Sequence, residues 1–121
     1  MPPRQPDPRG PASVAEVVAA LEAGSTPDQA ALGLAVRHLL RLLEGSAPGR
    51  SVEVRVVPIA AVQCVAGPRH TRGTPPNVVE TDPVTFVRLA TGRLDWAQAV
   101  ASGAVRASGP RADLSAYLPV A

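Results

Sequence analysis

Residues 92–118 read GRLDWAQAVASGAVRASGPRADLSAYL, and glycines divide this stretch into short elements. Asp95 is placed to cap a short helix, because an aspartate oxygen can accept a hydrogen bond from a free backbone amide in the first turn. We expect Gly92 and Gly103 to end two successive helices, since glycine adopts the left-handed conformation without steric penalty. A short strand over 104–108 and a final apolar turn or helix complete the pattern.

The preceding residues also contain signals that start and end short elements. Asp82 followed by Pro83 predicts a helix start, because proline is tolerated in the first turn and aspartate is a good N-cap. Before it, residues 52–57 alternate valine with charged side chains, which indicates a half-buried strand that Pro58 ends. We expect two further extended segments, over residues 59–66 and 77–81.

Two helices are predicted in the N-terminal part. Ser13 and Glu16 have the spacing of a capping box, so we expect a helix from Ser13 to Gly24. Thr26 is the expected cap of a second helix that continues to about Glu44. Residues 1–12 contain five of the fourteen prolines and no apolar period, and we expect a disordered arm there.

The length of 121 residues allows one domain, which we place at 13–121. The order of the predicted elements is helices, three strands, helices, one strand and a final turn or helix. This order is typical of an α+β fold in which helices pack on one face of a single sheet.

Composition and charge exclude several classes of function. The formal net charge is only +2, and the twelve basic residues are all arginines scattered among acids, so we expect no nucleic-acid binding. We find neither a secretory leader nor a membrane span, and we expect a cytoplasmic protein without stable membrane insertion. Cys64 is the only cysteine, which excludes an internal disulfide. The spacings point to no metal site, cofactor or catalytic motif, and we expect a protein that is not an enzyme.

Residues 67–77 read GPRHTRGTPPN and form the one loop with a cluster of basic groups. Arg69, His70 and Arg72 are candidates for holding a phosphate or carboxylate through charge-assisted hydrogen bonds. The alternative is that the two arginines pair with nearby acids and fasten the loop. A nucleophilic pair of Cys64 with His70 is disfavoured, because a thiol in an apolar strand has its pKa raised.

The glycine-punctuated stretch resembles the C-terminal signature of the sterol-carrier-protein-like family, which has the same order of a basic residue before leucine, a spaced alanine and glycine, a strand and a further glycine. The segment TDPVTFVRLATG at 81–92 resembles the helix before that signature. The central stretch VQCVAGPRHTRGTPPNVVETD is similar to short stand-alone members from actinobacteria. The resemblance implies a sheet of about five strands with an apolar cavity beneath its helices.

This resemblance implies binding or transfer of a lipid or other hydrophobic small molecule, with the basic loop as a site for an acidic headgroup. The expected ligand-binding side chains are those of Val54, Val56, Val62, Phe86, Leu89, Trp96, Val105 and Leu118. The alternative is an accessory interaction module with a filled core, because the same fold resembles the C-terminal part of mycothiol-dependent maleylpyruvate isomerases. Ligand, partner and oligomeric state are left open by the sequence.

Overall fold

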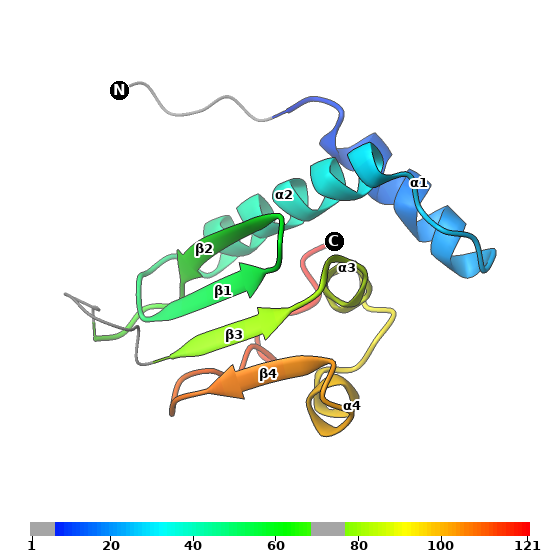
Figure 1. Ribbon diagram of the computed structural model, residues 1–121. Helices are drawn as coiled ribbons and strands as arrows, with labels where there is room; N and C mark the ends of the chain where they lie inside the picture. Colours follow the sequence, from blue (N-terminus) through cyan, green and yellow to red (C-terminus); the bar gives the residue numbers. More distant parts are fainter. Residues whose placement is uncertain (1–6, 69–76) are drawn as a thin grey trace.

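The computed structural model describes residues 7–68 and 77–121, in which helices pack against one face of a four-stranded mixed sheet (Figure 1). The helices are α1 (Gly10–Glu22), α2 (Gln29–Ser46), α3 (Pro83–Ala90) and α4 (Trp96–Ala101). The strands are β1 (Val52–Val56), β2 (Ala60–Cys64), β3 (Val78–Thr81) and β4 (Val105–Ser108). The predicted α+β class is confirmed.

The sheet has the strand order β2-β1-β3-β4, so β2 and β4 form its two edges. The β1–β2 hairpin is antiparallel, β1 and β3 run parallel, and β3 pairs with β4 antiparallel. Val54 lies opposite Val62 on one side and Val79 on the other. Because directly opposed residues share a face, this register aligns valines on one face and charged residues on the other.

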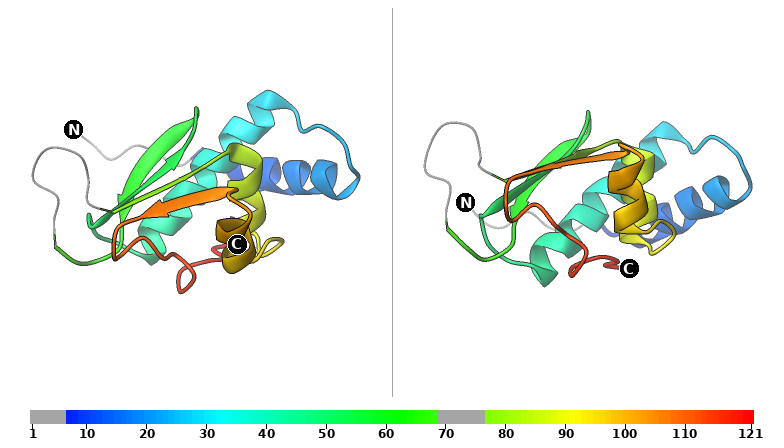
Figure 2. Two further views of the ribbon diagram at one scale, coloured as in Figure 1. Left: turned by 60° about the horizontal axis from the view of Figure 1, so that its bottom comes forward. Right: turned by 90° about the horizontal axis from the view of Figure 1, so that it is seen from below.

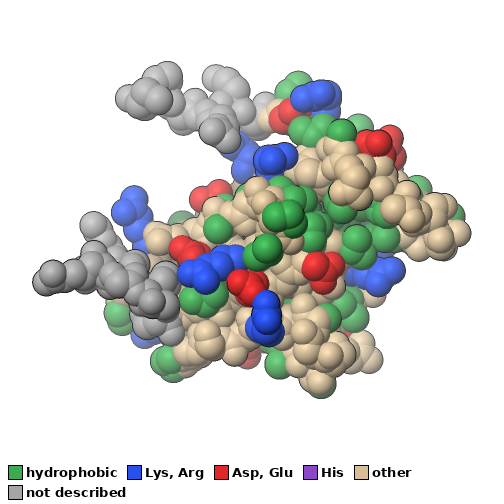
Figure 3. Space-filling model, viewed as in Figure 1, with side chains coloured by type: hydrophobic (Ala, Val, Ile, Leu, Met, Phe, Trp, Pro, Cys, Tyr) green, Lys and Arg blue, Asp and Glu red, His purple; other side chains and the backbone are tan. Residues whose placement is uncertain are grey.

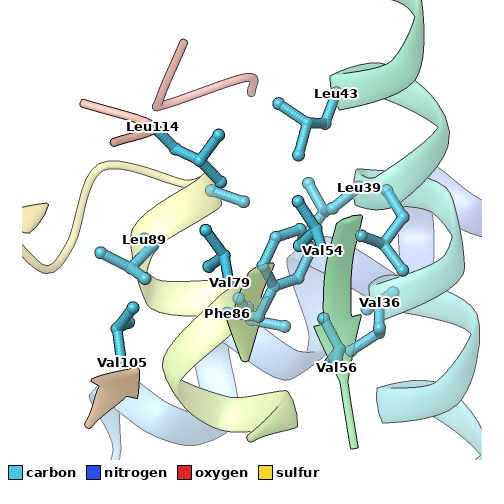
Figure 4. Packing of buried hydrophobic residues seen from close by; sticks show 14 of the residues in the cluster. Val36, Leu39, Leu43, Val54, Val56, Val79, Phe86, Leu89, Val105 and Leu114 are labelled. Carbon is cyan, nitrogen blue, oxygen red and sulfur yellow. The ribbon is translucent and has the colours of Figure 1, made fainter. Parts of the chain in front are cut away.

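The inner face of the sheet packs on α2 and α3, while no helix of the described residues covers the outer face (Figures 1 and 2). The close-up in Figure 4 shows the side chain of Phe86 lying between the valines of β1 and β3 and the leucines of α2. Val54, Val56 and Leu39 are fully buried in this cluster. The interior is built mostly from valine, leucine and alanine, as the composition indicates.

Helix α1 begins earlier than the sequence predicts. It starts at Gly10, with Arg9 as an N-cap that makes no side-chain cap bond, and residues 10–12 belong to the helix rather than to an arm. Ser13 lies inside the helix, 9% exposed, so the predicted capping box is wrong. Pro11 is compatible with this start, because a proline in the first turn removes only an amide that has no partner in the helix. Residues 1–6 lie outside the described residues.

Helix α2 begins two residues later than predicted. Asp28 is the cap and accepts a hydrogen bond from the Ala31 amide at 2.9 Å, whereas Thr26 is exposed and lies outside the helix. Pro27 is buried just before the cap. The helix also passes through Gly45 and ends at Ser46, two residues after the predicted end.

The caps and stops in the C-terminal half agree with the predictions. Asp82 and Asp95 accept bonds from the amides three residues ahead, at 3.0 and 3.3 Å. Gly92 and Gly103 have φ values of 77° and 80°, which is the left-handed conformation expected after a helix. The last predicted element is a turn or a helix. Residues 115–117 form a turn.

Candidate functional site

Five of the eight predicted ligand-binding residues belong to the buried interior. Val54 and Val56 have no exposed surface, Phe86 and Val105 are each 2% exposed, and Leu89 is 3% exposed. Figure 4 shows these side chains in contact with leucines and valines of the surrounding elements. The structure therefore does not bring the eight residues together around one cavity, because the interior side of the sheet is occupied by the protein itself.

Three of the eight predicted residues lie together, and one of them, Leu89, also belongs to the interior. Leu89, Trp96 and Leu118 line a surface cleft of about 310 Å³ between α3, α4 and the C-terminal tail, residues 114–121. We call it the tail cleft; its further lining residues are Gly92, Arg93, Leu94, Asp95, Ser115 and Pro119. Leu89 is 3% exposed, whereas Trp96 and Leu118 are half-buried and available to a ligand.

The C-terminal tail forms one wall of the tail cleft and makes few hydrogen bonds to α3. The amides of Val120 and Ala121 both donate to the Ala90 carbonyl, at 2.9 and 3.1 Å. Leu114 anchors the start of the tail in the core with 1% exposure. Between these two attachments the tail is held mainly by apolar packing, so its separation from α3 and α4 costs few hydrogen bonds.

A second and larger cleft lies at the opposite edge of the sheet. It has a volume of about 970 Å³ and runs between α2 and β2. We call it the edge cleft; it is lined by Asp7, Pro8, Arg9, Leu34, Arg37, His38, Leu40, Arg41, Glu44, Ile59, Ala60, Ala61 and Val62. Among these lining residues, Val62 is the one predicted to bind ligand, because no local pattern indicates that α2 and β2 leave space between them.

The segment before α1 forms one end of the edge cleft. Arg9 donates two hydrogen bonds to the Asp7 carboxylate, at 2.9 and 3.1 Å. Gly10 lies against His38 so closely that a β-carbon there would come within 2.5 Å of the imidazole Nδ1. Glycine is therefore required for this approach of α1 to α2.

A family model described as a bacterial SCP ortholog matches residues 28–120, which include α2, the four described strands and the tail up to Val120. The chain belongs to this family. No curated protein matches it in sequence. The match leaves α1 outside, so the segment that forms one end of the edge cleft lies beyond the part of the chain that the family model covers.

Cys64 of this SCP ortholog is fully buried at the end of β2. Burial away from water raises the pKa of its thiol to about 11, and the nearby Glu44 carboxylate acts in the same direction. The group is therefore a neutral thiol at neutral pH, which agrees with the expectation that it is not a nucleophile. Arg69, His70 and Arg72 lie outside the described residues.

Asn77 has a structural role that the sequence analysis missed. Its amide nitrogen donates to the Ser51 carbonyl, and its side-chain oxygen accepts from the Arg111 amide, both at 2.9 Å. This buried side chain thus joins the start of β1 to the segment after β4. No local pattern identifies such a residue, because its partners are distant in sequence.

Within the described residues, no helix combines the length and apolar character needed to cross a bilayer.

Proposed function

We propose that this protein binds a lipid or other hydrophobic small molecule without catalysing a reaction, and that the tail cleft receives the ligand. The observation that carries the proposal is the grouping of Leu89, Trp96 and Leu118 around one cleft in a member of this family. The cleft volume of about 310 Å³ is at the lower end of ordinary ligand pockets. Displacement of the tail would enlarge it.

The driving force is the removal of apolar ligand surface from water. At ~25 cal/mol per Å², burial of ~300 Å² would contribute about 7 kcal/mol before the costs of ordering are subtracted. Trp96 supplies a large apolar contact surface, and its indole N–H is a donor suited to a polar group of the ligand. The filled interior directs the ligand to the tail cleft rather than beneath the sheet.

Trp96 is the only tryptophan in the chain, so its fluorescence reports directly on the tail cleft. We expect a panel of fatty acids and sterols to include a ligand that shifts this emission at micromolar concentration, with native mass spectrometry giving one ligand per chain. Leu118→Glu should abolish the binding, because it places a charge in the apolar wall.

Val100→Glu is the matched control, since Val100 is 40% exposed on α4 and lies outside the cleft lining. A wild-type protein that binds no member of the panel would contradict the proposal. Equal binding by wild type and Leu118→Glu would exclude the tail cleft as the site.

The filled interior also favours a second candidate, an accessory interaction module of the kind that accompanies mycothiol-dependent maleylpyruvate isomerases. Val54, Val56 and Phe86 leave no room for a ligand beneath the sheet. This candidate predicts a single stoichiometric protein partner in a pulldown and no bound hydrophobic molecule.

A further inference from the structure

The edge cleft follows the free edge of a strand rather than one face of the sheet. Ala60, Ala61 and Val62 all line it, although successive side chains of a strand point to opposite faces. A cleft that touches three consecutive residues must therefore run along the backbone of β2. Among the strands of residues 7–68 and 77–121, β2 is terminal in the order and has β1 as its one neighbour.

This edge lacks the features that usually protect an exposed strand. Natural edge strands carry charges, prolines or bulges that discourage pairing with another chain. The β2 sequence AAVQC contains neither a charged residue nor a proline. The side chains of Ala60 and Ala61 are also small, so they shield the strand backbone less than longer side chains would.

The helical wall of the cleft is long enough to lie beside a short extended peptide. From Leu34 to Glu44 the helical wall spans ~15 Å at 1.5 Å per residue. An extended segment rises ~3.3 Å per residue, so four or five residues fill this length. An edge strand beside a helix, with a cleft between them, is the arrangement in which peptides bind as an added strand.

The helical wall indicates the charge of the peptide. Arg37 and Arg41 are one helical turn apart and both are exposed. Neither forms an ion pair with another side chain of the described residues, whereas Arg9 is held by Asp7. Glu44 adds one negative charge to the same wall, so the lining keeps an excess of one positive charge after Arg9 is balanced by Asp7. This excess favours an acidic ligand over a basic one.

We propose that an extended acidic segment of a partner protein docks in the edge cleft, adding a strand to β2 and placing carboxylates on Arg37 and Arg41. A second copy of this chain fits less well, because pairing β2 with β2 would bring the arginines of both copies to the same junction. The inference does not depend on hydrophobic-ligand binding, since the tail cleft and the edge cleft share no lining residue.

The test uses a fluorescein-labelled eight-residue peptide of alternating valine and glutamate, titrated with the full-length protein and followed by fluorescence anisotropy. We expect saturable binding, and we expect Arg37→Gln with Arg41→Gln to weaken it by about tenfold or more, since charge-assisted bonds are lost. The double variant Arg50→Gln with Arg88→Gln removes the same charge from exposed positions outside the cleft and should bind as the wild type does.

Further probes separate strand addition from simple charge attraction. The same peptide with methyl groups on alternate amides should bind weakly, because it cannot form the strand hydrogen bonds, and a valine–lysine peptide should not bind. Leu118→Glu should leave peptide binding unchanged, which separates this inference from the proposed ligand site. Absence of binding at millimolar peptide, equal loss in the control variant, or a dimer that competes with the peptide would each overturn the proposal.

Discussion

The two faces of the sheet are made from alternate residues of the same strands and differ in how strongly packing fixes them. On the inner face, Val54 and Val56 are completely buried against helices. On the outer face, Arg55 pairs with Glu53 and Arg106 pairs with Glu80. Figure 3 shows basic and acidic side chains interspersed on the surface turned to the viewer. The inner face therefore carries the stability of the fold, while the outer face mainly provides solubility.

The largest expected effect is on the inner face. Phe86→Ala should lower the free energy of unfolding by about 3–5 kcal/mol, because it removes a buried ring and leaves a cavity. Urea denaturation followed by circular dichroism measures this loss. A change below about 1 kcal/mol would show that the interior is loosely packed and would contradict the description of a filled interior.

An intermediate effect is expected at Cys64, at the edge of the inner face. Its folded pKa of about 11 lies above the ordinary value of 9.0, so the unfolded chain loses this proton first as the pH rises. The neutral thiol therefore makes its full contribution to the free energy of unfolding below pH ~9. This contribution is lost as the pH approaches 11.

The two pKa values differ by about two units, so the stability difference between the wild type and Cys64→Ala should shift by roughly 2–3 kcal/mol across this range. Denaturant titrations at intervals between pH 8 and 11 test this, and a difference independent of pH would refute it. The buried thiol should also resist modification by a thiol reagent at pH 8 until the protein is unfolded.

The smallest effect is expected on the outer face. Glu80→Gln removes the ion pair with Arg106, whose side chain is 78% exposed, and should change the unfolding free energy by less than about 1 kcal/mol. Thermal unfolding at low and high salt measures the difference, which should shrink as salt rises. A loss as large as that of Phe86→Ala would mean that the two faces contribute alike.

Much of the fold was predictable because its signals are local. Asp82 and Asp95 cap their helices with amides only three residues away, and the alternation in β1 directly separates the two faces. The N-terminal caps were predicted less well. Ser13 and Thr26 have suitable side chains, but a helix can begin at any of several neighbouring residues, and packing of α1 on α2 selects Gly10.

The candidate site was predicted only in part. Hydrophobicity identifies Phe86 and Trp96 equally well, yet one fills the interior and the other lines a cleft. That difference depends on how α3, α4 and the tail meet, which no local pattern encodes. The edge cleft was missed for the same reason, since Arg37 and Ala61 come together only through the tertiary packing of α2 beside β2.

The parallel pairing in the middle of the sheet has a consequence for the order of folding. In the β1–β2 hairpin the nearest partners, Val56 and Ala60, are four residues apart, whereas Glu53 and Val78 of the β1–β3 pair are separated by twenty-five. Closing the longer loop loses more chain entropy before any stabilising contact forms. We therefore expect the β1–β2 hairpin and α2 to form the folding nucleus. The C-terminal half then packs onto this nucleus last.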